Sequence, residues 1–404
     1  MTETPQPRAS LLARIQHGYR ESDASAQLFK TKTHTVITII SAITAIWVLV
    51  TLTNWMFNAE WQVILDKRRP FLVGKFPADQ MWRIWPGVWI FGALLGLSSG
   101  LWLRPGNNTA ITIAAGIAIL SFLLVELDST AINLALILLL ALAGYLVAVK
   151  AQDSPSVRSL ISRVTAVTWA LLIPFMIILL FVGDAPPTSY WGGIFVNVML
   201  AAIAIVIGTP VAVFLSLGRS LDGYPAIRIA STAFIEVVRG APLIAWLFMG
   251  RFVLPFILPS WFGMNEADVI FRTMIVLILF NAAYTAEVIR GGLQAIPKGQ
   301  YEAADSLGLG YFQTLRTIAL PQAFRAVLPS LINQYIGLFK DTTLVYLISV
   351  VDVLEVGRKA FNELDYTGTA LEVLVFVGFI FWLVTFSMSA ISRRVEANMG
   401  LGSR

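Results

Sequence analysis

Residues 134–149 read LALILLLALAGYLVAV and contain no charged side chain. The hydrocarbon core of a bilayer is about 30 Å thick, so a helix needs roughly 20 mostly apolar residues to cross it. Because lipid offers no hydrogen-bond partners, the backbone must satisfy its own polar groups, as it does in an α-helix. The run therefore predicts a membrane-spanning helix over about residues 130–149.

The rest of the chain shares this character. Of its 404 residues, 57% are hydrophobic and 13% are charged, whereas a soluble domain carries roughly 25% charged residues. The predicted fold class is an all-α integral membrane protein with about ten transmembrane helices. We expect the spans at about residues 35–55, 86–103, 109–125, 130–149, 164–183, 192–217, 233–257, 269–289, 325–347 and 370–391.

The residue inventory excludes several classes of function. There is no cysteine, and the two histidines are His17 and His34, so we expect no disulfide, no metal site and no cysteine nucleophile. The net charge of +5 comes from basic residues scattered over loops, which is typical of topology signals and not of nucleic-acid binding. Residues 1–33 lack the features of a cleaved signal peptide and are expected to be a cytoplasmic N-terminal segment.

Basic residues also predict the orientation, because cytoplasmic loops carry an excess of Lys and Arg. Five basic residues precede the first span, and counting spans from there places both termini in the cytoplasm. One loop disagrees: residues 56–85 contain DKRRP, Lys75 and Arg83, yet the count puts them outside. Either this loop is an exception on the outer side or one early span is misassigned.

The two halves of the chain differ in character. The first five spans carry no ionisable residue, so packing is the role expected for them. The Pro- and Gly-rich segment GDAPPTSYWGG, residues 183–193, then interrupts the helical pattern. Beyond it Gly, Pro and charged residues enter the spans, which is tolerated only against protein or a cavity. We expect an N-terminal membrane extension over 34–183 and the working core over 184–404.

Three places in that core put charged side chains at or near membrane depth. Lys340 and Asp341 could neutralise each other, while the hydroxyls of the two following threonines serve exposed backbone. This group is either a gate or translocation-path element, or a structural ion pair at a helix break. The residues concerned are Lys340, Asp341, Thr342 and Thr343.

The other two places lie earlier in the core. Arg239 and Pro242 mark a helix disruption at which the guanidinium either meets a carboxylate or serves as a packing anchor. Glu287 and Arg290 are three residues apart on one helical face and are expected to pair. The pair either fixes the approach to the next cytoplasmic loop or contacts a substrate.

That next loop, PKGQYEAADSLGLGYFQTLRTIALP over residues 297–321, is unusually polar for this chain. Pro297 suits a first helical turn, and the acidic residues that follow complement the helix dipole. Ala303, Ala304 and Leu307 share an apolar stripe, and Gly308 with Gly310 allows a sharp reversal. A second helix is expected to begin at Tyr311 and to stop before Pro321. By these residues alone, the loop is either a compact helical knob or an ordinary cytoplasmic loop.

The spacing of the loop resembles the EAA loop of ABC importer permeases. The matching residues are Glu302, Ala303, Ala304, Gly308, Ile318, Leu320 and Pro321. The resemblance implies that the loop is a coupling helix seated in a groove of a separate ATP-binding cassette subunit. Glu302 would pair there with basic groups or would cap its own helix. The chain has no G-x-x-x-x-G-K-[ST] phosphate loop, so ATP and Mg would be used by the partner and no cofactor would be bound here.

The resemblance is closer to the polar amino-acid permeases, the histidine, glutamine and general L-amino-acid uptake systems. It is carried by VVRGAPLIAWLF at 237–248, by residues 283–308 and by residues 320–356. It implies a five-helix core in the bacterial inner membrane that moves L-amino acids by alternating access and is not itself an enzyme. The implied partners are a periplasmic amino-acid-binding protein and a second permease subunit. The long N-terminal half resembles the long subunits of general L-amino-acid systems.

Other functions fit less well. A secondary transporter driven by an ion gradient needs two related halves with ionisable groups near midplane, and these halves are unlike each other. A membrane-embedded enzyme needs a polar catalytic constellation, which the sequence does not show. A purely structural subunit would leave the interrupted helices of the second half unexplained.

Overall fold

The computed structural model describes residues 31–102, 129–221, 223–257 and 268–398, and within these ranges it contains helices and no strands. Its contacts divide the chain into two compact units, residues 1–60 and 61–404. In the first unit, helix α2 (Lys32–Asn58) has no buried residue. The side chain of Thr31 caps this helix by accepting a hydrogen bond from the backbone N of His34 at 3.2 Å. A helix that is apolar on every side is suited to lipid.

Helices long and apolar enough to cross a membrane dominate the described residues. Seven pass this test singly, and one further pair passes together although it is bent by 102°. Each of the seven contains all or most of one long helix: α2, α5 (Trp85–Trp102), α7 (Ser129–Lys150), α8 (Pro155–Phe181), α9 (Gly193–Arg219), α13 (Val269–Gln294) and α18 (Ala370–Asn398). The bent pair consists of α10 (Pro225–Gly240) and the segment Leu243–Ile257, which contains α11 (Leu243–Phe248) and α12 (Leu254–Ile257).

These helices match most of the expected spans. The span expected at 109–125 lies outside the described residues, and the one at 233–257 is the bent pair. In place of a single span at 325–347, the chain forms α16 (Leu320–Asp341) and then a 3-10 turn, η7 (Thr342–Ile348). The all-α membrane fold class is confirmed.

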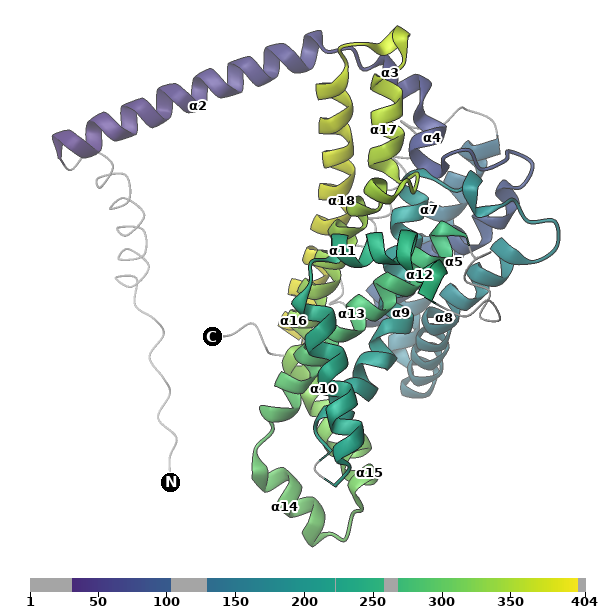
Figure 1. Ribbon diagram of the computed structural model, residues 1–404, viewed down its shortest axis with the longest axis vertical. Helices are drawn as coiled ribbons and strands as arrows, with labels where there is room; N and C mark the ends of the chain where they lie inside the picture. The colour runs from purple at the N-terminus through teal and green to yellow at the C-terminus, as the bar shows by residue number, and fades with distance from the viewer. Residues whose placement is uncertain (1–30, 103–128, 222, 258–267, 399–404) are drawn as a thin grey trace. The chain divides into compact units, whose positions relative to one another are not determined.

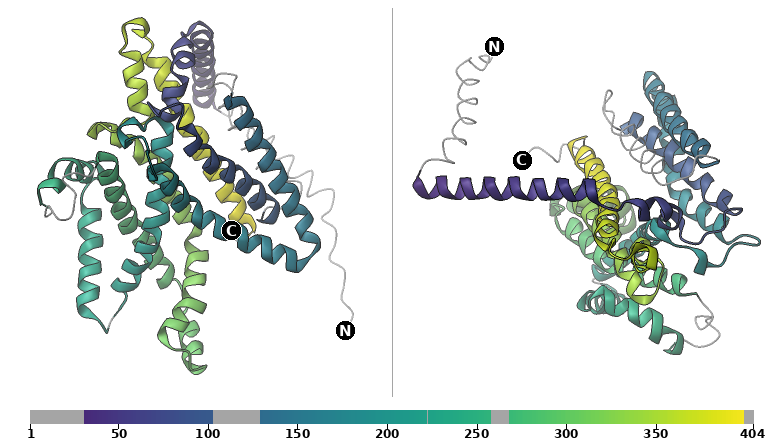
Figure 2. Two further views of the ribbon diagram at one scale, coloured as in Figure 1. Left: turned by 90° about the vertical axis from the view of Figure 1, so that its right-hand side faces the viewer. Right: turned by 90° about the horizontal axis from the view of Figure 1, so that it is seen from above.

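Helices α5, α7 and α8 lie together at one side of the second unit (Figure 2). Glycines spaced by four residues let α5 approach α7 closely: a Cβ at Gly96 would lie 1.9 Å from the carbonyl oxygen of Ala141. Small residues at this spacing are a common device for helix packing in membranes. Trp169 of α8 donates a hydrogen bond to the Ser98 hydroxyl of α5 at 2.9 Å. The packing role expected for these charge-free spans agrees with this arrangement.

The basic loop at 56–85 is folded. It contains α3 (Gln62–Asp66), α4 (Arg68–Val73) and the turn η1 (Met81–Arg83). Arg83 is 5% exposed, and its guanidinium donates to the carbonyl oxygens of Leu179 and Val182, both at 2.7 Å, at the end of α8. Arg83 therefore caps the C-terminal end of α8. A charge used in this way is not a signal of the cytoplasmic side.

The core consists of α9, α10, α13, α16, α17 (Val353–Phe361) and α18. Helices α14 (Lys298–Ser306) and α15 (Tyr311–Thr314) lie at one end of the unit, and α3, α4 and α17 lie at the other (Figure 1). We call these the α14 end and the α17 end. The loop at 56–85 packs at the α17 end, so it lies opposite the polar loop at 297–321. The side of the membrane on which it lies stays a prediction.

Candidate functional site

Helix α14 carries the Glu-Ala-Ala motif and ends in a Schellman turn. Gly308 has φ +72°, its backbone N donates to the oxygen of Asp305 at 2.9 Å, and the N of Leu309 donates to that of Ala304 at 3.1 Å. This left-handed conformation suits glycine, because a side chain there would be strained. The reversal expected at Gly308 is confirmed. Gly310 has an ordinary φ of −69° and instead precedes α15.

The stripe expected on α14 is only partly buried. Ala304 is completely buried, whereas Ala303 is exposed and Leu307 is 78% exposed. Two aromatic side chains follow, Tyr311 at 50% and Phe312 at 81% exposure. The α14 end thus leaves Leu307 and Phe312 largely exposed and Tyr311 half exposed.

The prediction that the second helix stops before Pro321 is wrong. After α15 the backbone makes a π-helical turn, Leu315–Ala319, and continues directly into α16. Proline lacks a backbone N–H and its ring crowds the carbonyl four residues earlier, and a widened turn accommodates both effects. Pro321 therefore marks a continuous helix that connects the loop to the membrane core.

Contacts hold the loop to the two long helices on either side of it. The Gln322 amide of α16 donates to the Gln300 side chain of α14 at 3.0 Å. The π-turn residues Leu315 and Ala319 are buried in a cluster with Ile289 of α13. Ile318 and Leu320 are half-buried. Any displacement of α14 would therefore act on α13 and α16 together.

The carboxylate of Glu302 points to solvent and, within the described residues, makes no hydrogen bond or ion pair. The capping alternative is thus not formed; the Ser306 hydroxyl donates instead to the backbone oxygen of Glu302 at 2.8 Å. Glu302 is available to an external group.

A charged cluster centred on Glu287 joins three long helices, α9, α10 and α13. Glu287 of α13 pairs with Arg290 as expected, with Arg290 Nε donating to both carboxylate oxygens at 3.0 Å. The same carboxylate lies 3.3 Å from Arg219 of α9 and 3.9 Å from Arg239 of α10. Arg219 also reaches Glu236 at 2.8 Å. One carboxylate is shared by three guanidiniums, so the cluster ties together the ends of α9, α10 and the last turns of α13.

Arg239 occupies the break that the sequence predicted. Helix α10 ends at Gly240, and the chain turns by 102° before α11, with Pro242 immediately preceding it. The Arg239 guanidinium lies 5.4 Å from the centre of the Tyr284 ring, a cation–π contact. The same side chain thus lies both near the carboxylate of Glu287 and at the helix break, and its place in the translocation path stays a prediction.

The expected Lys340–Asp341 pair does not form. Consecutive residues on a helix point in directions about 100° apart, and neither side chain has an ion pair within the described residues. The hydroxyls behave as expected: Thr342 donates to the Phe339 oxygen at 2.6 Å, and Thr343 to that of Lys340 at 2.9 Å.

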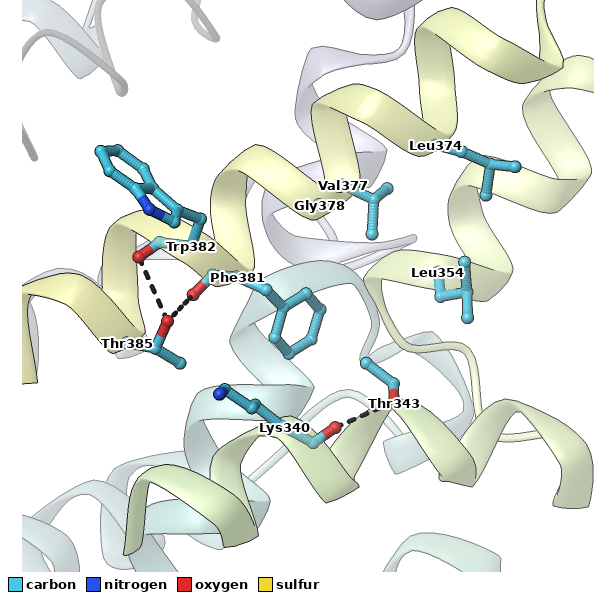
Figure 3. Close-up of a pocket in the computed structure, with 9 residues that line it drawn as sticks. All are labelled: Lys340, Thr343, Leu354, Leu374, Val377, Gly378, Phe381, Trp382 and Thr385. Atoms are coloured by element: carbon cyan, nitrogen blue, oxygen red, sulfur yellow. Dashed lines mark hydrogen bonds between the residues drawn. The ribbon is translucent and has the colours of Figure 1, made fainter. Parts of the chain in front are cut away.

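Lys340 instead lines an open groove of about 490 Å³ between α16 and α18. Figure 3 shows Lys340 and Thr385 at one end of the groove and Leu354 and Leu374 at the other. Apart from the lysine, the lining is apolar or hydroxylic. The remaining lining residues are Thr343, Val377, Gly378, Phe381 and Trp382.

A buried polar network near Thr342 escaped the sequence prediction. Asn197 of α9, Thr342 and Asp352 are all completely buried. The Asn197 amide donates to the Thr342 hydroxyl at 3.0 Å and to Asp352 at 3.2 Å, and its oxygen accepts from the backbone N of Val353 at 3.1 Å. An asparagine within an apolar span was the available signal, but its partners lie about 150 residues away in the sequence.

Asp352 also caps α17, since its carboxylate accepts from the backbone N of Glu355 at 2.8 Å. Burial raises the pKa of Asp352 to about 6, although hydrogen bonds from Glu355 and Asn197 act in the opposite direction. The network joins α9, η7 and α17 at the α17 end.

The predicted site residues therefore form three separate groups. These are the loop at the α14 end, the cluster around Glu287, and the Lys340 groove with its neighbouring threonines. No hydrogen bond or ion pair links one group to another within the described residues, so helix packing is what connects them.

Comparison with known proteins places this architecture. The family described as "Binding-protein-dependent transport system inner membrane component" matches residues 208–400. The inner membrane amino-acid ABC transporter permease protein YhdY of Escherichia coli is 40% identical over 239 residues, covering 58% of this chain and 64% of that protein. The glutamate/aspartate import permease protein GltK of Escherichia coli is 34% identical, covering 49% of this chain and 87% of that protein.

A third relative aligns with almost the whole chain. The glutamate/glutamine/aspartate/asparagine transport system permease protein BztC of Rhodobacter capsulatus is 31% identical over 421 residues, covering 92% of each chain. The N-terminal half is thus included in the likeness. The chain belongs to the amino-acid ABC transporter permeases, the inner-membrane components of binding-protein-dependent transport systems.

Proposed function

We propose that this chain is the transmembrane permease subunit through which an ATP-driven importer moves L-amino acids across the bacterial inner membrane by alternating access. The observation that carries the proposal is the loop at the α14 end. It combines the Glu-Ala-Ala motif, a Schellman turn at Gly308 and large apolar side chains left exposed, in a chain that has no phosphate loop of its own.

The exposed surface of this loop fits a protein groove. Leu307, Tyr311 and Phe312 present apolar area, and Glu302 adds a solvent-facing carboxylate beside it. Aromatic anchors are typical of the centre of a protein interface, and a charged neighbour is typical of its polar rim. We assign the partner as an ATP-binding cassette subunit, which would bind ATP and Mg and hydrolyse the nucleotide.

Transmission from the loop to the membrane follows from its attachments. Because α14 is bonded to α16 and because the π-turn packs against α13, a movement of α14 would displace both helices. The Glu287 cluster lies on the same α13 and holds α9 and α10 to it. These contacts support a rigid lever that would change the tilt of several helices at once.

The passage itself is assigned to the core over 184–404. The break at Arg239 and Pro242 and the groove at Lys340 put polar groups and irregular backbone at membrane depth, which is tolerated where they face a cavity. Lys340, Thr342 and Thr343, with Asp341, remain candidates for the translocation path. The extension over 34–183, with its uncharged spans, is assigned to packing.

Orientation and partners follow from the same assignment. With the α14 end in the cytoplasm, the α17 end faces the periplasm and both termini lie inside, as the basic residues predict. A periplasmic amino-acid-binding protein would deliver the substrate to the α17 end. A second, homologous permease subunit would complete the pathway, and the names of the relatives favour polar amino acids as substrates.

Uptake into proteoliposomes tests the proposal. The chain, purified with its ATP-binding, permease and binding-protein partners, is expected to accumulate labelled polar L-amino acids when ATP is enclosed, and to continue when an ionophore collapses ion gradients. A non-hydrolysable ATP analogue should stop uptake. Uptake that needs no ATP but disappears with the ionophore would instead establish the ion-driven alternative.

A further inference from the structure

Residues 61–76, here called the strap, belong to the N-terminal half but pack on the core at the α17 end. Val63 and Phe71 of the strap are completely buried, and the Phe71 ring meets that of Phe376 in α18 edge-on at 5.2 Å between centroids. The strap side chains share one apolar cluster with α17 and α18. The buried partners are Val353, Val356, Ala360, Val373, Val377 and Ile380.

The strap also fits tightly against the start of α9. Gly74 has φ +68°, and a Cβ added there would lie 2.4 Å from the Cα of Gly192. A Cβ at Gly193 would lie 2.4 Å from the carbonyl oxygen of Phe71. Because these backbones are so close, the strap cannot slide along α9 unless α9 itself moves.

Two polar contacts fix the strap along the far end of α17. Lys67 lies 2.6 Å from Glu363, and the Tyr366 hydroxyl donates to Asp66 at 2.6 Å. Both are solvent-accessible, so each contributes little to stability. They instead favour one position of the strap along the turn that follows α17, because only that position brings Lys67 to Glu363 and Asp66 to Tyr366.

Helix α17 is therefore held on two sides. On one side Asp352 and Asn197 bind it to α9 and η7 within the core. On another side the strap, which comes from the other half of the chain, packs against α17 together with α18. The strap completes the apolar cluster that α17 and α18 form.

We infer that the strap positions α17, so that the N-terminal half of the chain sets where the α17 end of the permease core stands during transport. Phe71 and Lys67 are its positioning residues. The inference rests on the proposed function for its meaning in transport, but the positioning itself is a structural statement and is testable without transport.

Hydrogen exchange of the full chain in lipid nanodiscs tests the positioning directly. Phe71→Ala empties the space beside Phe376, so amides of residues 353–361 should exchange at least about tenfold faster than in the unmodified chain. The matched control is Phe91→Ala, which removes an aromatic ring that pairs with Trp169 and lies outside the apolar cluster of the strap with α17 and α18. It should leave exchange in α17 unchanged. Equal exchange in α17 for Phe71→Ala and the unmodified chain would overturn the inference.

A charge reversal at the surface tests the link to transport and needs no buried change. Lys67→Glu opposes Glu363 and should lower the maximal rate of ATP-driven uptake about two- to fivefold, with the half-saturating concentration unchanged. Combining it with Glu363→Lys should restore the rate. A single variant without loss, or a double variant without recovery, contradicts the role of the strap. If the unmodified chain shows no ATP-driven uptake, the proposed function fails. The hydrogen-exchange result still shows whether the strap positions α17.

Discussion

At the α17 end a buried polar network joins the core helices, whereas at the α14 end two large apolar side chains of the polar loop are left exposed. Asn197, Thr342 and Asp352 are completely buried and bonded to one another. Leu307 and Phe312, by contrast, are 78% and 81% exposed. The buried network gives the α17 end a defined resting position, and the exposed apolar area of the α14 end is suited to contact with a partner. The difference supports the coupling role that we propose for the α14 end.

The largest expected effect comes from breaking the turn that ends α14. Gly308→Val places a β-branched residue at φ +72°, which costs about 1–2 kcal/mol or more in this conformation. Uptake should fall at least about tenfold, while membrane insertion and ATP hydrolysis persist, because the lever is distorted and not removed. Uptake and ATP hydrolysis are measured on the same proteoliposomes.

The matched control is two residues away. Gly310 has φ −69°, and a Cβ added there would meet open space, so Gly310→Val should retain most of the uptake. Normal uptake in Gly308→Val, or equal losses in both variants, would remove the turn from the coupling mechanism.

A pH titration sharpens the description of the α17 end. The pKa of Asp352 is raised from 3.8 to about 6, so the folded protein holds this proton over a range in which the unfolded chain has lost it. The contribution of this group to the free energy of unfolding is fully present below about pH 4. It is lost as the pH rises through about 6, and the total loss is about 3 kcal/mol.

The measurement is the Tm of detergent-solubilised protein between about pH 4.5 and 7.5, a range that brackets the titration. The unmodified chain should lose stability relative to Asp352→Asn as the pH rises, because the amide keeps the α17 cap without titrating. Parallel pH profiles for the two proteins would show that Asp352 does not carry this proton.

The Glu287 cluster gives an intermediate effect at the other end of the core. Glu287→Gln leaves Arg219, Arg239 and Arg290 without their shared charge, and the free energy of unfolding should fall by about 1–3 kcal/mol. Glu236→Gln is the control, since Glu236 is more exposed and bonds to one arginine, and it should cost less than about 1 kcal/mol. Denaturant unfolding compares the two variants. An equal loss of unfolding free energy would show that Glu287 is not the main charge of the cluster.

The smallest effect is expected at the rim of the strap. The hydrogen bond from Tyr366 is the main cause that lowers the pKa of Asp66, and the same bond raises that of Tyr366 to about 12. Both groups face solvent, so Tyr366→Phe should leave Tm and uptake nearly unchanged. The pKa of Asp66, followed by NMR, should rise toward its ordinary value. A large loss of Tm would mean that the rim, and not Phe71, holds the strap.

Local chemistry predicted much of this structure. Apolar length located the spans, the break at Arg239 and Pro242 was visible as a Gly-Ala-Pro interruption, and Gly308 was identified as the reversal because few residues adopt its conformation. The Glu287–Arg290 pair followed from helical spacing alone. Each of these features depends on residues close together in the sequence.

The failures have the opposite origin. A stop before Pro321 was expected because proline lacks a backbone N–H. The widened turn that accommodates it packs against α13, a segment that is not adjacent in the sequence. The Lys340–Asp341 pair failed because consecutive residues on a helix point in different directions. The network of Asn197 with Asp352 and the contact of Phe71 with Phe376 join distant segments. The short helices α3 and α4 are too brief to show a periodic pattern.

The comparison between the two ends can be tested most directly by photo-cross-linking. A photoreactive amino acid is placed at Leu307, at the α14 end, or at Leu364, which is 94% exposed at the α17 end. Irradiation of membranes that contain the assembled transporter should join the ATP-binding subunit to the chain from position 307 and not from position 364. An adduct with that subunit from position 364, or none from position 307, would contradict the assignment of the coupling role to the α14 end.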